Sequence, residues 1–165
     1  MPIRVGVLTI SDRVSRGEMA DTGGDEVVNV LRRTVEGVDI TRATVADELE
    51  DIRRILIGWS DVEHLDAVVT TGGTGLGPRD ITPQATEAVI SGRIPGIEES
   101  IRQRGMEHIA TAMLSRGVAG FRNQTLIVNL AGSPNAAREG AEVIVSVLTH
   151  AVDLLHGRTR HSHST

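Results

Sequence analysis

Apolar and polar positions follow two different periods along this chain. Short apolar, β-branched runs bounded by polar or glycine-rich segments predict strands at residues 3–10, 39–46, 66–71 and 125–130. Apolar residues recurring every three or four positions predict helices at residues 24–36, 48–61, 82–91 and 95–109, and a long final helix from Pro134. Because strands and helices alternate, we predict an α/β fold with three layers, a mostly parallel sheet flanked by helices.

The late part of the chain interrupts this alternation. Residues 117–121 and 125–130 predict a β-hairpin that turns at 122–124 and adds an antiparallel edge to the sheet. Residues 1–157 are predicted to form one domain. Residues 158–165 have no core pattern, so we predict a disordered tail whose histidines are solvated rather than bound to a metal.

Composition narrows the classes of function. The 165 residues include one Phe, one Trp and no Tyr, so stacking platforms for single-stranded nucleic acid are missing. The net charge of −5 also argues against a nucleic-acid partner. No run reaches membrane-spanning length, and the absence of cysteine is typical of a reducing compartment. We therefore expect a cytoplasmic protein with neither nucleic acid nor membrane as partner.

A glycine-rich loop over residues 72–77 carries the main functional signal. It follows the predicted strand at 66–71 and precedes the helix at 82–91, and ligands of α/β sheets bind where strands end and helices begin. Its glycines expose backbone N–H groups, which form concavities for anions. Arg79 and Asp80 add one charge of each sign. The loop therefore predicts a phosphorylated ligand with a metal ion nearby.

This loop departs from two common phosphate-binding patterns. Pro78 and Arg79 stand where a P-loop has Lys and Ser or Thr, and the third glycine of the dinucleotide fingerprint is missing. The alternative is a ligand-free turn in which Thr82 caps the next helix and Pro83 begins it. Long glycine-rich turns usually have a binding function, so we favour a ligand-binding site over a ligand-free turn.

Further acidic residues follow other predicted strands. Parallel topology brings Asp12, Asp47 and Asp80 to one edge of the sheet, where Mg²⁺ binds carboxylates together with substrate oxygens. Each residue also has a structural interpretation. Asp12 fits a turn or a cap, and Asp47 fits the N-cap of the helix at 48–61 as well as it fits a catalytic role. Histidines show no metal spacing or triad, and we interpret them as surface or helix-end residues.

The loop also resembles a known family. Its sequence, TTGGTG followed by RDITP over residues 70–83, is similar to the signature of the molybdopterin-binding domain in molybdenum-cofactor biosynthesis proteins of the MogA and MoaB kind, gephyrin included. Further matching segments occur in the family's order: Ser11-Asp12-Arg13 with Gly17, Asp21 and Gly23; Pro95-Gly96; Leu114-Ser115-Arg116-Gly117 with Ala119-Gly120; and Asn129-Leu130-Ala131-Gly132-Ser133-Pro134-Asn135. The family usually has proline where this chain has Ala131, which predicts a looser loop there.

This resemblance implies a reaction and a set of site residues. The family transfers an adenylyl group from ATP to the terminal phosphate of molybdopterin with Mg²⁺. Asp47 and Asp80 match its two essential acidic residues, and we predict that both are catalytic and bind the metal. The substrate contacts that we predict are Ser11, Asp12, Gly72, Gly73, Thr74, Gly75, Thr82, Ser115, Gly132, Ser133 and Asn135.

The resemblance also implies partners and leaves alternatives. Family members form homotrimers, with hexamers as a second possibility, and commonly pass their product to a molybdate-inserting enzyme. One alternative function is a non-catalytic molybdopterin-binding or scaffold protein. Another is an enzyme that uses the same fold on a different phosphorylated substrate.

Overall fold

The computed structural model describes residues 1–158, so all of the predicted tail except Arg158 lies outside the described residues. A six-stranded sheet runs in the order β2-β1-β3-β6-β5-β4. Its parallel strands are β1 (Arg4–Ile10), β2 (Asp39–Val45), β3 (Ala67–Thr71) and β6 (Thr125–Leu130). Strands β5 (Ala119–Arg122) and β4 (Gly92–Arg93) complete the sheet as an antiparallel edge. The predicted mostly parallel sheet with an antiparallel edge is confirmed.

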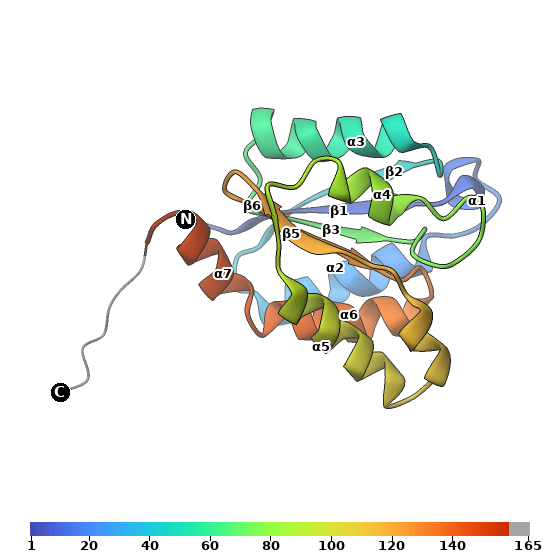
Figure 1. Cartoon of the computed structure of the whole chain (residues 1–165). Helices are drawn as coiled ribbons and strands as arrows, with labels where there is room; N and C mark the ends of the chain where they lie inside the picture. Colours follow the sequence, from blue (N-terminus) through green and yellow to red (C-terminus); the bar gives the residue numbers. More distant parts are fainter. Residues whose placement is uncertain (159–165) are drawn as a thin grey trace.

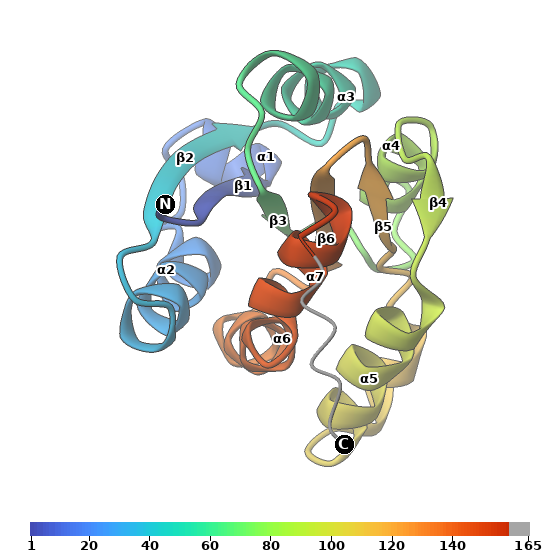
Figure 2. The same cartoon turned by 90° about the vertical axis from the view of Figure 1, so that its left-hand side faces the viewer.

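Helices cover both faces of the sheet (Figures 1 and 2). Helices α3 (Leu49–Ile57) and α4 (Thr82–Glu87) lie on one face, with a π-helical turn (Gly58–Val62) after α3. The other face carries α2 (Thr22–Thr34), α5 (Pro95–Met106), α6 (Pro134–Val145) and α7 (Leu148–Leu155). A short α1 (Asp12–Ser15) follows β1. Among residues 1–158, no helix combines the length and apolar character that crossing a membrane requires.

Several predicted bounds were wrong for local reasons. Helix α2 begins at Thr22 because Asp21 caps it, accepting a hydrogen bond from the N–H of Gly24 at 3.0 Å. The long final helix is two helices; between them, the Ser146 hydroxyl donates to the carbonyl of Val143, and the chain turns at 146–147. Strand β4 was not predicted, because two residues carry no readable period.

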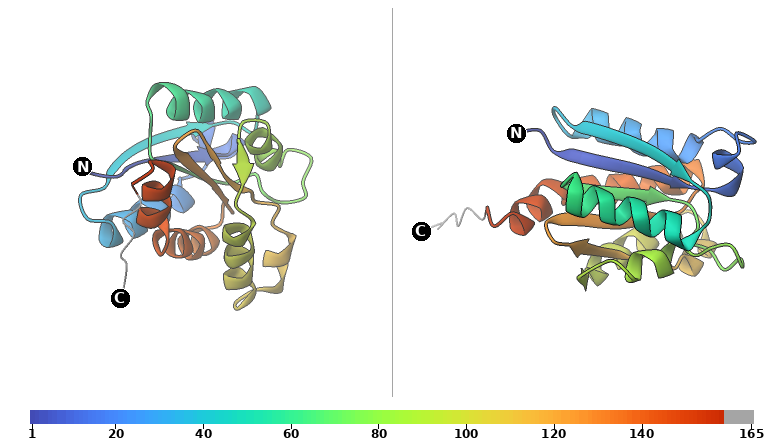
Figure 3. Two further views of the ribbon diagram at one scale, coloured as in Figure 1. Left: turned by 60° about the vertical axis from the view of Figure 1, so that its left-hand side comes forward. Right: turned by 90° about the horizontal axis from the view of Figure 1, so that it is seen from above.

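The segment after α5 also differs from the prediction. Helix α5 ends at Met106 rather than near residue 109, and a 3₁₀ turn (Ala110–Leu114) follows. The N–H groups of His108 and Ile109 both donate to the carbonyl of Gly105, which closes the helix end. The 3₁₀ turn that follows lies against α5 (Figure 3).

Alternation along the strands divides the core between the two faces. On β1, Val5 and Val7 belong to the apolar cluster under α2 and α6, whereas Leu8 and Ile10 belong to the cluster under α3. Trp59, the single tryptophan, packs in the second cluster over Gly6, where a Cβ atom would lie 2.4 Å from the indole ring. The size of the indole thus requires glycine at this position in the central strand.

We predict that Gly6→Ala destabilises the fold by about 1–3 kcal/mol, because the added methyl overpacks the core against Trp59. Gly58→Ala is the matched control: its backbone is helical and no atom lies within 4 Å of the added Cβ, so we expect no loss of stability. Urea denaturation measures both free energies of unfolding. Equal stability of the two variants would contradict this packing analysis.

Candidate active site

The carboxyl ends of β1, β3 and β6 meet around one residue, Gly72. Its φ of +95° is in the left-handed region, and a Cβ atom there would lie 2.2 Å from the carbonyl oxygen of Ile10. Its N–H donates to Leu130 O at 3.0 Å, and a Cβ on Gly132 would lie 3.2 Å from its Cα. The predicted convergence of strand ends is thereby confirmed.

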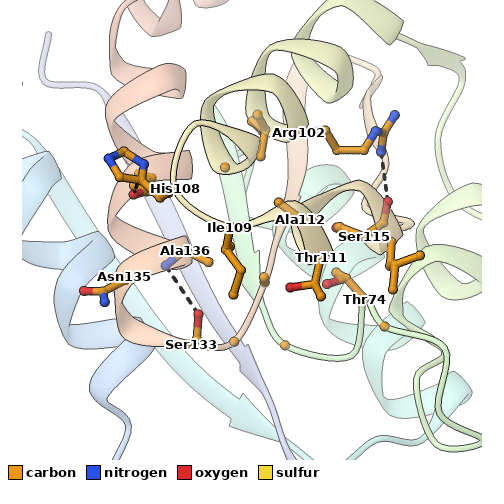
Figure 4. Close-up of a pocket in the computed structure, with 18 of the residues that line it drawn as sticks. Thr74, Arg102, His108, Ile109, Thr111, Ala112, Ser115, Ser133, Asn135 and Ala136 are labelled. Atoms are coloured by element: carbon orange, nitrogen blue, oxygen red, sulfur yellow. Dashed lines mark hydrogen bonds and ion pairs between the residues drawn. The ribbon is translucent and has the colours of Figure 1, made fainter.

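Two cavities adjoin at this point and share Gly72, Gly73, Asp80, Gly132 and Ser133 as lining residues. The larger, of about 750 Å³, extends toward α5, the 3₁₀ turn and α6 (Figure 4). It also contains four of the predicted substrate contacts: Thr74, Gly75, Ser115 and Asn135. The smaller, of about 400 Å³, lies against β1 and the start of α2, and adds Ser11 and Asp47.

Asp47 is held by a reciprocal pair of hydrogen bonds. Its Oδ2 accepts from the N–H of Asp12 at 2.9 Å, and its own N–H donates to Asp12 Oδ1 at 3.0 Å. Asp47 is not the N-cap of α3; that position belongs to Glu48, whose side chain makes no capping bond. Burial raises the pKa of Asp47, the N–H of Asp12 partly opposes this, and the negative charges of Asp12 and Asp80 raise it further.

Asp12 supports the site rather than lining either cavity. Arg79 donates to both of its carboxylate oxygens at 3.0 Å and to Glu48 Oε1 at 2.9 Å. The Arg79 hydrogen bonds, joined by the N–H of Asp47, lower the pKa of Asp12 and keep it ionised. Its carboxylate thus holds Asp47 and, through Arg79, the glycine loop. The substrate contact at Asp12 stays a prediction.

Asp80 sits at the end of a tight turn that Arg116 clamps. Asp80 Oδ2 accepts from the N–H of Gly77 at 2.9 Å. The guanidinium of Arg116 donates to Gly75 O at 2.9 Å and to Asp80 O at 2.7 Å, while its backbone N–H donates to Thr74 O at 2.9 Å. Arg116 thus fixes both ends of the segment that carries Asp80. Its place in the sequence suggested a residue near the site but not this function.

The hydroxyl residues near the loop have structural partners as well. Thr82 is fully buried and donates to Gly72 O at 2.9 Å, so it supports the glycine loop from within the protein. The substrate contact at Thr82 stays a prediction. It is not the N-cap of α4, which is Ile81. Ser11 caps α1 and Ser133 caps α6, as predicted for Ser133, and both also line a cavity.

The larger cavity contains a pair that the sequence did not reveal. His108 Nδ1 lies 3.0 Å from Glu139 Oε1, and both residues line the cavity (Figure 4). We interpreted His108 as an ordinary surface or helix-end histidine, and this was incomplete. Helix α5 ends at Met106, and His108 beyond it faces Glu139 on α6. In the sequence, Glu139 is one of several polar residues in the final helix, and no local pattern indicates that it lines a cavity.

The arrangement fits a metal ion shared with a substrate better than a metal held by protein alone. Within residues 1–158, no group of three or more His, Cys, Asp or Glu side chains could hold a metal ion. Asp47 and Asp80 each keep Oδ1 without a hydrogen bond from the described residues. Carboxylate oxygens of this kind are donors that Mg²⁺ accepts when substrate oxygens complete its shell.

Comparison with known proteins identifies the family. The family model described as "Probable molybdopterin binding domain" matches residues 6–150. The chain therefore belongs to the molybdopterin-binding family of molybdenum-cofactor biosynthesis proteins, as its motifs indicated. The molybdopterin adenylyltransferase of Helicobacter pylori is 42% identical over 156 residues, which are 94% of this chain and 89% of that protein.

Two further relatives support the assignment. The molybdopterin adenylyltransferase of Escherichia coli is 37% identical over 141 residues, covering 85% of this chain and 72% of that protein. The crystal structure of the molybdopterin biosynthesis enzyme MoaB from Thermus thermophilus has a TM-score of 0.87 and 45% identity, covering 94% of this chain and 97% of that chain. Similarity of sequence and of fold thus extends over most of the chain.

We predict that Arg116→Lys loosens the segment 75–80, because one ammonium cannot bridge two carbonyls in the manner of the guanidinium fork. Hydrogen exchange, followed by mass spectrometry, should accelerate in this segment and stay unchanged in the sheet. Arg104→Lys, whose ion pairs with Glu107 and Glu142 are on the surface, serves as control. Unchanged exchange in the loop of Arg116→Lys would contradict the clamp.

We predict that Asp47→Asn raises the thermal stability of the protein near neutral pH. The pKa of Asp47 is raised in the folded protein, so its ionisation costs stability as the pH rises through that pKa. The Asn oxygen can still accept from Asp12, and only the charge is lost. Calorimetry should show a higher Tm for the variant near neutral pH, and no difference at acid pH, where Asp47 is protonated in both states. A lower Tm at neutral pH would contradict the prediction.

Proposed function

We propose that this chain is a molybdopterin adenylyltransferase. In the reaction, an oxygen of the terminal phosphate of molybdopterin attacks the α-phosphorus of ATP. The bond between that phosphorus and the bridging oxygen to the β-phosphate breaks, and pyrophosphate leaves. Adenylylated molybdopterin is the other product. Four family relatives named molybdopterin adenylyltransferase support the proposal, with 37–42% identity to this chain.

The observation that carries the proposal is the pair of adjoining cavities. Adenylyl transfer joins two large substrates through their phosphates. An active site for this reaction therefore needs two cavities that meet in one shared region for the phosphates. Here the shared residues are the start of the glycine loop, the N-terminus of α6 at Ser133, and Asp80. Asp47 lines the smaller cavity, beside that shared region.

The chain's own residues supply positioning and charge stabilisation. Backbone N–H groups of the glycine loop and of the α6 N-terminus are suited to phosphate oxygens, and they are fixed before the reaction begins. The N-terminus of α2, at Thr22 and Gly23, lines the smaller cavity and is likewise suited to phosphate oxygens. Arg116 and Thr82 hold the loop rigid, which limits its reorganisation during transfer.

We propose Asp47 and Asp80 as the ligands of a Mg²⁺ ion. Such an ion neutralises charge on the phosphates when it is bound. Without a metal ion, the negative charges of Asp47 and Asp80 would repel the phosphates of the substrates. A Mg²⁺ ion between them would remove this repulsion, because it would bind both the carboxylates and the phosphate oxygens. Their fixed geometry, set by Asp12 for Asp47 and by Gly77 and Arg116 for Asp80, is what ligands of Mg²⁺ require.

A non-catalytic molybdopterin-binding or scaffold protein is the main alternative. Gephyrin of Dictyostelium discoideum is 38% identical, but this chain corresponds to only 23% of that protein. Binding alone would not require two carboxylates beside anionic ligands, and this favours an enzyme. The second alternative is an enzyme that uses the same glycine-rich loop on another phosphorylated substrate. Such an enzyme would release no pyrophosphate in response to molybdopterin in the assay below.

For assembly and location we propose a cytoplasmic homotrimer, with a hexamer as the alternative, that delivers its product to a molybdate-inserting enzyme. Exposed apolar side chains at the end of α5 and in the 3₁₀ turn support self-association; these are Met106, Ile109, Met113 and Leu114. Light scattering of the purified chain distinguishes a monomer from a trimer or a hexamer.

The decisive assay follows pyrophosphate released from ATP with and without molybdopterin, in the presence and absence of Mg²⁺. Molybdopterin-dependent release, with the adenylylated product seen by mass spectrometry, is the expected result. Binding of molybdopterin without turnover would favour the scaffold. Release that depends on a different phosphorylated compound would favour another substrate.

We predict that Asp80→Ala lowers the turnover number at least about 100-fold, because a group that stabilises transferring charge is lost. Asp51→Ala is the control, since Asp51 pairs only with Arg54 on the outer side of α3. Circular dichroism should show both variants folded. Full activity of a folded Asp80→Ala variant would remove Asp80 from the mechanism.

A further inference from the structure

We infer that Asn129 is a positioning residue of the site. Its buried side-chain amide holds three segments of the protein that together carry the glycine loop. Asn129 belongs to one of the segments that match the family, yet it lines neither of the two cavities, so its action on the reaction is indirect. The expected effect on turnover rests on the proposed function, whereas the expected effect on the loop does not.

Alternation along β6 places Asn129 on the face of the sheet that α4 covers. Ile127, two residues earlier on the same strand, packs in one apolar cluster with Ala85 of α4. The strand register pairs Asn129 with Thr70 on β3. The side chain of Asn129 thus lies between a neighbouring strand and the covering helix, and the residue is only 3% exposed.

The amide of Asn129 makes three hydrogen bonds in this position. Nδ2 donates to Thr70 Oγ1 on β3 and to Thr86 Oγ1 on α4, each at 3.0 Å. Oδ1 accepts from the N–H of Val118 at 3.1 Å. Because a backbone N–H can only donate, the contact with Val118 fixes which end of the amide is the oxygen. Both threonines are fully buried, so the whole arrangement lies in the interior.

Each of the three partners adjoins a different part of the loop. Thr70 lies two residues before Gly72, on the strand that leads into the loop. Thr86 belongs to α4, the helix that follows the loop. Val118 comes two residues after Arg116, which clamps the loop from the side. One amide therefore sets the relative positions of the segments that begin, end and clamp the loop.

An amide in the core is unfavourable unless its polar groups are bonded, and an apolar side chain would need no such partners. Apolar contacts hold two elements together without selecting one relative position, because they have no preferred direction. A fully satisfied polar network is directional and makes the packing rigid. The glycines of the loop have no side chains to pack, so the shape of the loop depends on where its ends are held.

The test removes one buried hydroxyl at a time. Thr86→Val nearly keeps the shape of the side chain and removes the acceptor for one amide hydrogen of Asn129. Thr125→Val is the matched control, because Thr125 is 1% exposed on the same strand and its hydroxyl donates to Leu65 O at the end of the sheet away from the loop. Thr86→Ser keeps the hydroxyl and tests rescue.

Hydrogen exchange, followed by mass spectrometry, reports on the loop in each folded variant. The N–H of Thr82 donates to Gly73 O at 3.2 Å and closes the base of the loop. In Thr86→Val we expect exchange over residues 72–82 to accelerate at least about tenfold, because this base opens more often. Thr125→Val and Thr86→Ser should leave exchange in this segment within about threefold of the wild-type rate.

Turnover is the second readout. Thr86→Val should lower kcat about tenfold and leave the KM for ATP within about threefold, because the positions of the loop groups are disturbed and the groups themselves remain. Thr125→Val should keep kcat within about twofold of the wild type. A purely structural function of the network would lower the stability of both variants and change kcat in neither.

Unchanged loop exchange in a folded Thr86→Val variant would overturn the inference, as would equal acceleration in Thr125→Val, or faster loop exchange with an unchanged kcat. If Thr86→Val does not fold, Thr70→Val takes its place with the same expectations. Failure of both to fold beside a folded Thr125→Val would also overturn the inference, because the network would then support the whole sheet and not the loop in particular.

The two readouts separate this inference from the proposed reaction. Loop exchange that depends on Thr86, in a protein whose wild type transfers no adenylyl group, would support the positioning by Asn129 and refute the reaction. Adenylyl transfer by the wild type, with loop exchange that does not depend on Thr86, would support the reaction and refute the positioning.

Discussion

Backbone packed directly on backbone is the constraint on which this site depends. Gly72 presses against the carbonyl of Ile10, and Gly132 against Gly72; a Cβ on Gly23 would lie 2.6 Å from the carbonyl oxygen of Gly132. Any side chain at these points would force the strand ends apart. Their contact brings the N-termini of α2 and α6 to the glycine loop and makes the two cavities meet. Sterics alone, before any polar contact, thus define where two substrates could react.

Around this contact, charged side chains are used mainly to hold other protein groups. Arg79 occupies Asp12, Asp12 positions Asp47, and Arg116 bridges two carbonyls of the loop that carries Asp80. These hydrogen bonds are all made within the protein. What they provide is a loop and two carboxylates whose positions are set in advance, which is the arrangement that favours stabilisation of charge as it develops. Burial first, and then the negative charges of Asp12 and Asp80, raise the pKa of Asp47, so its ionised form is less favourable here than in water.

Much of the fold and part of the site could be predicted from the sequence. Strand and helix periods, the glycine loop and the order of elements predicted the parallel sheet, and parallel topology predicted that Ser11, Asp47, Asp80 and Ser133 would converge. Pairings across long sequence distances could not be predicted. Nothing near Asp12 indicates that its N–H binds Asp47, and an arginine that contacts carbonyls, such as Arg116, leaves no partner residue to recognise. The pair of His108 and Glu139 was hidden by the unexpected end of α5.

The form of the Arg116 clamp has a practical consequence. Because it contacts main-chain carbonyls, it places no demand on the side chains between them, and Leu76 at the loop tip is 67% exposed. The chain contains no cysteine. A thiol introduced at position 76 would therefore be unique, and a dye attached there would sit on the glycine loop that borders both cavities, at a residue that lines neither. The protein is in this respect ready to be made into an optical sensor of its own ligands.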